Sequence, residues 1–427
     1  MPHFVESIES AKKPSMKPSI DLNAFGVTRN AFLPAESPLE LLSDSYYEPW
    51  EHIVKHLPEL IDNGSIRDVV AQLPVLETSR LISEAEWQRA YVMLGFMAQA
   101  YIWGGDKPAE VLPPQITVPF LLVSAHFDLP PVLTYAAANL WNFAGSGNDF
   151  IHPEDLKVLC SFTGTESESW FLLISVAMEG RGAGIIDTMM EAIAAIPSRD
   201  YETIIWALEE LRECILDVGI LLERMFERCE PMVFYHQIRP FLAGSKNMAS
   251  SGLPRGVFYD EGDGKGQWRE LCGGSNGQSS LIQFFDLVLG VDHKGNATSP
   301  SAVVEKSYHQ EVREYMPGPH RKFLQHVTSM GSIRELALLP PETDEQRRLQ
   351  AAYVAATEAL SDFRNKHIKI VTRYIVLPSK QPWKGAARQN LASSSSATKV
   401  LTGTGGTLLM PFLKQARDET ADTGRLE

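Results

Sequence analysis

The sequence predicts an all-α protein with a small N-terminal domain and a larger helical C-terminal domain. Apolar residues recur at steps of three and four along several long stretches, whereas alternating strand patterns are scarce. Proline and glycine clusters separate these stretches. The 427 residues, 44% hydrophobic and 22% charged, are enough for two domains with sizeable cores.

The first domain is expected to be built around one buried helix. The stretch Glu86 to Trp103 is apolar nearly all round after its first turn, which is typical of a helix inside a helical domain. Pro131 then lies where a second helix, Val132 to Trp141, can begin. The turn-rich run GSGND follows, so we predict domains at 1–155 and 156–427.

The second domain carries most of the predicted helices. They cover Trp170 to Met190, Tyr201 to Phe226, Pro231 to Leu242, Ser280 to Val291 and Glu345 to Val376. Residues 380–406 are rich in Ser, Thr, Gly and Ala and lack a helical period, which predicts a mobile loop. The amphipathic element Leu408 to Ala416 then returns the chain to the domain.

Charge and cysteine usage favour a small-molecule ligand and a reducing compartment. The formal charge is 39 − 53 = −14, which disfavours nucleic acid or an anionic membrane as the partner. Four cysteines without CxxC spacing indicate free thiols. The first 17 residues lack a signal-peptide core, and no apolar run reaches the ~18 residues of a spanning helix. We therefore expect a soluble cytoplasmic protein.

One histidine interrupts the apolar face of the last long helix. The face consists of Tyr353, Ala356, Leu360, Phe363, His367, Ile370 and Tyr374. The His367 imidazole should therefore point inward, where each ring nitrogen needs a hydrogen-bond partner or a metal. The pattern alone favours a packed histidine, because most such residues are hydrogen-bonded rather than metal-bound.

Two other polar residues lie on mostly apolar helices. Ser175 lies one turn after Phe171 in WFLLISVAM, so the hydroxyl and the ring share a face, although a bond from the serine to its own helix is the commoner arrangement. Arg239 follows Phe234 and Tyr235. Its guanidinium forms either a structural ion pair, the reading we favour from the pattern alone, or a clamp for a substrate carboxylate.

The glycine runs and the other histidines give no nucleotide or zinc motif. CGGSNGQSS lacks the Gly-Lys-Ser/Thr ending of a phosphate loop, and GTGGT lacks the strand and spacing of a dinucleotide fingerprint. His52 and His56 share a helix face without the glutamate of a metalloprotease motif.

Eight segments together carry a resemblance to one family. They are AYIWGG, LPPVLTYAAANLWN, WFLLIS, FYHQIR, GGSNGQSSLIQFFD, REYMPGPHRKFL, KHIKIVTRYI and GTGGTLLMPFL. In order and rough spacing the chain resembles indoleamine 2,3-dioxygenase over nearly its whole length. The extended Ser-rich segment is similar to that of a fungal-type member.

The resemblance implies a haem b site with a small N-terminal domain capping its distal side. His367 matches the proximal iron ligand, and Asp286 and Arg364 match a polar pair beside it that tunes the ligand. The matched substrate-binding residues are Tyr135, Phe171, Phe234, Arg239, Ser275 and Thr404. Ser175 would donate or accept a distal hydrogen bond without acting as an essential base, because a neutral hydroxyl is a poor proton acceptor.

The implied reaction inserts O2 across the C2–C3 bond of L-tryptophan and gives N-formylkynurenine, the first step of the kynurenine pathway towards NAD. An electron donor would keep the iron ferrous. Two alternatives stay open: a haem-binding sensor with little turnover, and a helical scaffold in which His367 is merely packed. Asn139 and Asn276 depart from the family pattern, and the resemblance does not say how they change substrate choice.

Overall fold

The computed structural model describes residues 20–147, 149–293, 308–383, 403 and 409–426. Most of them are helical, which confirms the all-α class. The helices are α1 Glu48–Lys55, α2 Leu57–Asp62, α3 Ile66–Ala71, α4 Glu84–Trp103, α5 Pro114–His126, α6 Glu166–Arg181, α7 Ile185–Ala194, α8 Tyr201–Glu223, α9 Met225–Arg228, α10 Pro231–Val233, α11 Ser280–Leu289, α12 Tyr308–Arg313, α13 Gly318–Thr328, α14 Ile333–Ala337, α15 Asp344–Val371 and α16 Leu409–Thr423. The strands are β1 Val111–Leu112, β2 Phe143–Gly145, β3 Leu156–Val158, β4 Val257–Gly262 and β5 Lys265–Arg269.

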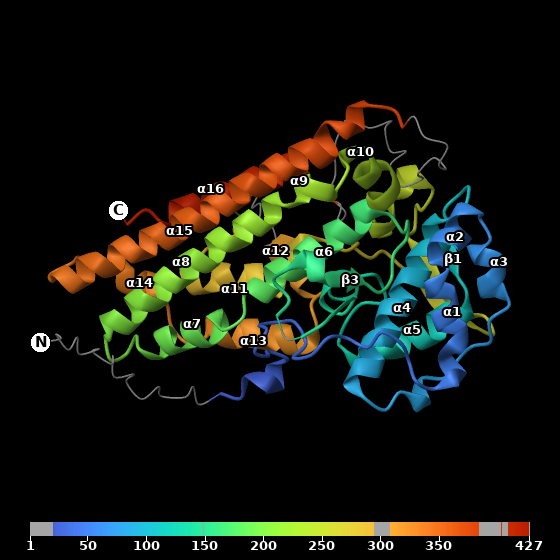
Figure 1. The fold of residues 1–427 in the computed structure, drawn as a ribbon, viewed down its shortest axis with the longest axis horizontal. Helices are drawn as coiled ribbons and strands as arrows, with labels where there is room; N and C mark the ends of the chain where they lie inside the picture. Colours follow the sequence, from blue (N-terminus) through green and yellow to red (C-terminus); the bar gives the residue numbers. More distant parts are fainter. Residues whose placement is uncertain (1–19, 148, 294–307, 384–402, 404–408, 427) are drawn as a thin grey trace, which may run out of the picture.

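Helices α1 to α5 gather at one end of the molecule around α4 (Figure 1). Ser83 and Glu86 form a capping box at the start of α4, and each side chain bonds to the other's backbone amide. Almost every residue of α4 after its first turn is buried, as the all-round apolar pattern predicts. The predicted helix from Glu86 to Trp103 is thus confirmed.

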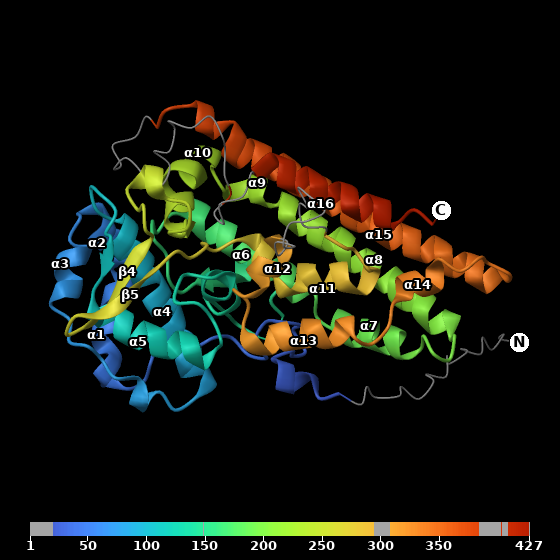
Figure 2. The ribbon, with the colours of Figure 1, turned by 180° about the vertical axis from the view of Figure 1, so that it is seen from behind.

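Helices α8, α15 and α16 run side by side along the other part of the molecule (Figures 1 and 2). A second capping box, from Thr343 and Gln346, starts α15. The predicted stripe on α15 is buried at Tyr353, Leu360 and Ile370, which are at most 5% exposed. The apolar face of α15 therefore packs against the core, and His367 lies on the same face of the helix.

The prediction of one continuous helix from Trp170 to Met190 is wrong. The chain forms α6 and α7 with a break at Gly182–Gly184. Gly184 has φ +76°, a left-handed conformation that glycine adopts without steric cost. The apolar period continues across the break, so the period alone did not reveal it.

Two further predicted helices are helical but are not regular α-helices, and the first is shorter than predicted. Residues 132–141 form a π-helical turn at Ala136–Leu140, and residues 231–242 form α10, a π-helical turn at Phe234–Ile238 and a 3-10 turn at Arg239–Leu242. Pro240 cannot donate a backbone hydrogen bond, which explains the change of helix type there.

A β-hairpin that the sequence did not predict joins the two halves of the chain. Strands β4 and β5 pair antiparallel, and β4 also pairs parallel with β1 from the first half. The hairpin lies beside α4 and α5 (Figure 2). Contacts therefore cross the predicted boundary at residue 155, and the division into two domains stays a prediction.

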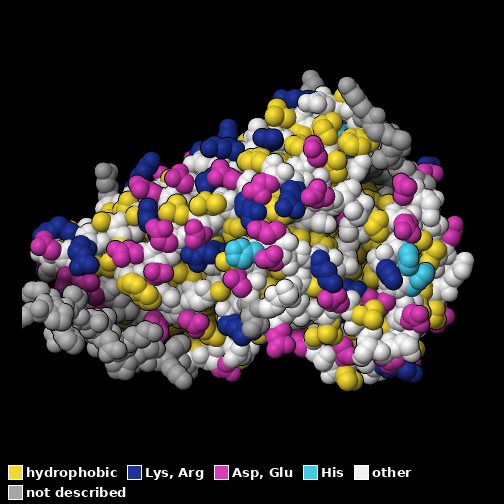
Figure 3. Space-filling model, viewed as in Figure 1, with side chains coloured by type: hydrophobic (Ala, Val, Ile, Leu, Met, Phe, Trp, Pro, Cys, Tyr) yellow, Lys and Arg dark blue, Asp and Glu magenta, His cyan; other side chains and the backbone are white. Residues whose placement is uncertain are grey.

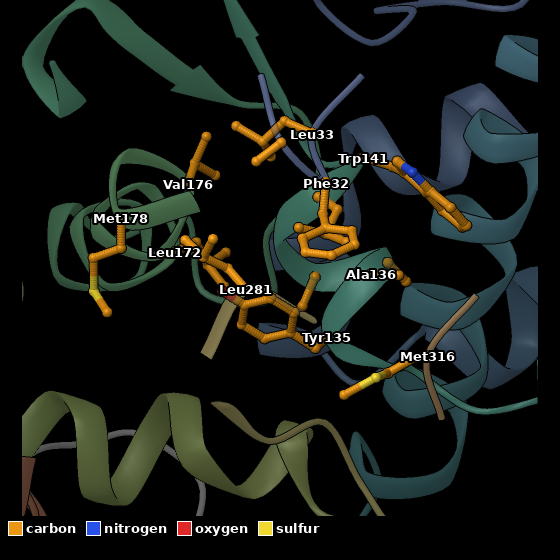
Figure 4. Packing of buried hydrophobic residues seen from close by; sticks show 14 of the residues in the cluster. Phe32, Leu33, Tyr135, Ala136, Trp141, Leu172, Val176, Met178, Leu281 and Met316 are labelled. Carbon is orange, nitrogen blue, oxygen red and sulfur yellow. The ribbon is translucent and has the colours of Figure 1, made fainter. Parts of the chain in front are cut away.

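Buried side chains from both halves share one core. Figure 4 shows Phe32 and Leu33 of the first half close to Leu172 and Val176 of α6. All four are at most 3% exposed. This packing connects the early segment to the helix that carries Phe171 and Ser175.

The described residues include one stretch long and apolar enough to cross a membrane, Glu166–Ala194. Of its apolar window, 72% is buried inside the protein, as in a core helix. On the face shown in Figure 3, Lys and Arg side chains are interspersed with Asp and Glu. All four cysteines are buried and none forms a disulfide, as the spacing predicts.

Candidate functional site

A cavity opens between α6, α11, α15, α16 and the turns after Thr134 and Val233. It holds about 1770 Å³ of space free of protein atoms, including the part open to solvent. Eight of the residues predicted from the sequence line it: Tyr135, Phe171, Phe234, Arg239, Ser275, Asp286, Arg364 and His367.

Of the remaining two predicted site residues, one does not line the cavity and the other is outside the described residues. Ser175 is 3% exposed and is not among the lining residues. It lies within hydrogen-bonding reach of the hydroxyl of Tyr135, which lines the cavity. Thr404 falls outside the described residues, although its neighbour Gly403 lines the cavity.

His367 presents its ring to the cavity from α15. Burial, and then repulsion by Arg364, lower the pKa of the imidazole to about 4. The surface exposure of the residue is intermediate rather than zero, because the ring faces the cavity. Within the described ranges it forms no hydrogen bond. A neutral imidazole is the form that ligates a metal, through a ring nitrogen that accepts no hydrogen bond.

Asp286 and Arg364 form an ion pair on the cavity wall. Arg364 Nη2 lies 2.5 Å from Asp286 Oδ1, and the two side chains are 12% and 4% exposed. Burial raises the pKa of the Asp286 carboxyl, but Arg364 and the hydrogen bond from His293 outweigh it and hold the pKa well below its usual range. Because Arg364 precedes His367 by three residues on α15, the pair can fix the helix turn that carries the imidazole.

His293 connects this ion pair to Glu419 on α16, and the sequence analysis predicted neither residue. Its Nε2 is 3.2 Å from Asp286 Oδ2, and its Nδ1 is 2.8 Å from Glu419 Oε2. Burial lowers the pKa of His293, but the two carboxylates raise it overall, which favours the charged ring. No periodic pattern marks His293 or Glu419, because they lie 126 residues apart.

The same cluster has the composition of a metal site, because donor atoms of Asp286, His293 and His309 all lie within 4.8 Å of one another. However, both ring nitrogens of His293 already face carboxylates. Arg364 Nη2 also lies 3.4 Å from His293 Nε2, and a cation there repels a metal ion. The geometry therefore indicates an ion-pair network rather than a metal site.

Aromatic rings and one cation form another wall. The ring centroids of Phe171 and Phe234 are 4.9 Å apart, and those of Phe234 and Tyr374 are 5.7 Å apart at 90°. The guanidinium of Arg239 lies 5.7 Å from the centre of the Tyr235 ring. Burial lowers the pKa of Arg239. A buried cation beside aromatic rings suits an aromatic ligand that bears a carboxylate.

A buried carboxyl group, Glu179, also lines the cavity and was missed by the sequence analysis. Its Oε1 accepts hydrogen bonds from the Tyr135 hydroxyl at 3.0 Å and from Ser279 Oγ at 2.6 Å. Burial raises the pKa of Glu179 to about 7, against the effect of these two bonds. Its place one turn after Ser175 on an apolar helix was the signal that could have found it.

All three π-helical turns in the described chain contribute to the cavity. They are Ala136–Leu140, Phe234–Ile238 and Thr372–Val376, and each supplies at least one lining residue. A π turn inserts an extra residue into a helix and is often found at functional sites. Asn139 and Phe234 therefore reach the cavity from π-helical turns and not from regular α-helices.

The fold and the cavity define the class of protein. It is a helical protein with an interior small-molecule site that combines an imidazole, aromatic walls and a buried cation. The comparisons with known proteins then define the family. The model of the indoleamine 2,3-dioxygenase family matches residues 21–423. The chain therefore belongs to the indoleamine 2,3-dioxygenase family and is an oxygenase enzyme.

Fungal relatives are similar over nearly the whole chain. Indoleamine 2,3-dioxygenase nanC of Aspergillus nanangensis is 39% identical, over 95% of this chain and 98% of the relative. Indoleamine 2,3-dioxygenase of Saccharomyces cerevisiae is 40% identical, over 93% and 92%. A third relative, 6-hydroxytryptophan 2,3-dioxygenase fscD of Fusarium equiseti, is 38% identical, over 92% and 95%. The resemblance inferred from the eight sequence segments is thus confirmed.

The residues present fit the haem on which this family depends. His367 offers a neutral nitrogen without a hydrogen bond, and apolar side chains such as Phe363, Ile370 and Leu409 line the same cavity. His367 would hold the haem through such a nitrogen, and the apolar side chains would surround the cofactor. The Asp286–Arg364 pair supplies polar groups beside the ligand.

Proposed function

We propose that this protein is a cytoplasmic haem b dioxygenase that converts L-tryptophan and O2 to N-formylkynurenine, the first step of the kynurenine pathway towards NAD. The observation that carries the proposal is the neutral imidazole of His367, which faces a cavity with aromatic walls and a buried arginine. The relatives named indoleamine 2,3-dioxygenase support the same activity.

His367 would hold the haem iron, and the ion pair of Asp286 and Arg364 would orient the helix turn that bears it. The haem supplies the activation of O2 when it is bound and kept ferrous by an electron donor. His293 and Glu419 would keep Asp286 ionised, because the charged ring of His293 stabilises the carboxylate.

The other residues would bind and orient the substrate. Arg239 would bind the carboxylate of tryptophan, since a planar guanidinium forms two parallel hydrogen bonds to a carboxylate. Phe171 and Phe234 would pack against the indole. Tyr135, Ser275 and, as the family resemblance implies, Thr404 would complete the pocket. Fixing the indole in one orientation and excluding water lower the barrier without a protein base.

Two hydrogen bonds stabilise the part of the cavity wall that contains Tyr135. The Tyr135 hydroxyl and Ser279 Oγ both donate to Glu179. Ser175 lies within hydrogen-bonding reach of the Tyr135 hydroxyl and does not line the cavity, so we propose that it positions the tyrosine rather than exchanging a proton with the substrate. A neutral serine hydroxyl is a poor proton acceptor, which agrees with this positioning role.

The test is mass spectrometry of the products formed by haem-loaded, reduced protein with L-tryptophan and labelled O2. We expect N-formylkynurenine that carries two labelled oxygen atoms. A product with one labelled atom would contradict the dioxygenase reaction. Normal haem loading without product from any indole would instead favour the haem-binding sensor.

A further inference from the structure

Asn139 borders the cavity with an amide oxygen, Oδ1, that has no hydrogen-bond partner among the described residues. The residue lies in the π-helical turn Ala136–Leu140 and is 4% exposed. Its Nδ2 donates to the Tyr135 carbonyl at 3.3 Å, which anchors the amide group. Its Oδ1 accepts no hydrogen bond from any part of the chain that the structure describes.

Asn142, three residues later, is a buried asparagine whose side-chain amide is fully hydrogen-bonded, as expected for a structural role. Asn142 is 1% exposed, its Oδ1 accepts from the Cys160 amide at 2.7 Å, and its Nδ2 donates to the Cys160 carbonyl at 2.9 Å. Both ends of this amide are satisfied. Asn142 does not line the cavity, whereas Asn139 does.

An unpaired amide oxygen is unfavourable in this position, because the cavity wall is largely apolar. Ala138, Phe171, Leu172 and Phe234 line the same cavity and offer no hydrogen-bond donor from their side chains. A buried acceptor without a partner is normally avoided, and exceptions often mark a ligand site. A ligand that brings its own donor would satisfy Asn139.

We propose that Asn139 selects among indole substrates by accepting a hydrogen bond at Oδ1 from a donor on the indole ring. This inference rests on the proposed function. The carboxylate and ammonium groups of a tryptophan share one carbon, so a substrate held at Arg239 carries its remaining donors on the ring. Those donors are the ring N–H and, in a hydroxylated tryptophan, the hydroxyl on the benzene ring.

The test compares the wild type with Asn139→Leu, a change of similar volume that removes the acceptor. The substrates are L-tryptophan, 1-methyl-L-tryptophan, which lacks the ring N–H, and tryptophans hydroxylated at each benzene carbon. Both kcat/KM and the calorimetric binding constant are measured on haem-loaded protein. Taking the ratio of variant to wild type for each substrate cancels the bulk of the added methyl or hydroxyl group.

If the ring N–H is the donor, Asn139→Leu lowers kcat/KM for L-tryptophan about tenfold relative to 1-methyl-L-tryptophan. If a ring hydroxyl is the donor, the variant loses about tenfold for one hydroxytryptophan relative to L-tryptophan. Either result supports the selection by Asn139 and identifies its partner. An equal change for every substrate, or no change, overturns it.

Asn142→Leu is the matched control, because the Asn142 side chain does not line the cavity and forms hydrogen bonds only to the backbone of Cys160 and Ala138. We expect a lower unfolding midpoint but unchanged ratios between substrates. Failure of the proposed function has a different signature, since the wild type would then form no product from any indole. Wild-type turnover with unchanged ratios in Asn139→Leu would remove only the inference about Asn139.

Discussion

Replacing Arg239 with leucine should weaken the use of tryptophan without removing the haem. Arg239 lines the cavity from the turn that follows Phe234 and is far along the chain from His367. Its guanidinium is buried, so a carboxylate bound there would be shielded from water. Leucine keeps the volume apolar and adds no competing charge.

The expected loss follows from two charge-assisted hydrogen bonds. Each contributes about 1.5–3 kcal/mol when one partner is charged. Their sum is about 3–6 kcal/mol, which corresponds to a loss in kcat/KM of about 10² to 10⁴ for L-tryptophan. Most of it should appear in KM, because the carboxylate is held equally in the ground state and the transition state.

The assay is steady-state formation of N-formylkynurenine by haem-loaded protein at several tryptophan concentrations. Tryptamine, which lacks the carboxylate, serves as a second substrate and should be affected less than about threefold, since it makes no bond that the variant removes. Arg373→Leu is a matched control, because Arg373 is an exposed cation that stacks over Phe226. Equal losses for tryptophan and tryptamine, or no loss for either, would refute the clamp.

Three other predictions concern haem binding, stability and pH. His367→Ala should purify as folded protein without the haem absorption band; an unchanged spectrum would show that His367 is merely packed. The buried Arg89 donates to Glu51 from Nε at 3.1 Å and from Nη2 at 2.5 Å. Glu51→Leu removes this carboxylate and should lower the free energy of unfolding, measured by chemical denaturation, by about 3–5 kcal/mol. Adding Arg89→Met to that variant should recover part of this loss, and no recovery would count against the ion pair. Burial raises the pKa of Glu179 to about 7, above its value in the unfolded chain, so its contribution to stability is complete below about pH 4.3 and is lost as the pH rises towards 7. Relative to Glu179→Gln, the haem-free wild type should therefore lose stability on the order of 3 kcal/mol over that range, and parallel curves for the two proteins would contradict the raised pKa.

Much of the helical scaffold was predictable, because its signals are local. Both capping boxes, at Ser83 and Thr343, involve residues only three positions apart. The apolar stripe of α15 likewise repeats within a few turns, so it predicted both the helix and the inward direction of His367. The π-helical turns escaped the sequence analysis, since their extra residue is accommodated by packing around the cavity rather than by a local propensity.

The pairing of β1 with β4 could not be predicted from local patterns. Val111 and Phe258 are partners across more than a hundred residues, and β1 has only two residues in which to show an alternation. His293 and Glu419 are separated in the same way, and nothing near either residue indicates the other. Such contacts form because the helices bring distant segments together.

The sequence by itself determined the helical class, the family and the set of candidate residues, because periodicity, caps and family motifs are properties of short segments. Only the tertiary structure decided which of those residues share a cavity, that Ser175 lies beside the Tyr135 hydroxyl, and that Glu179 and Asn139 border the same space. The reason is physical. Burial and hydrogen-bond partners depend on distances between segments that are remote in the chain, and these quantities set the charge of His367, Asp286 and Glu179.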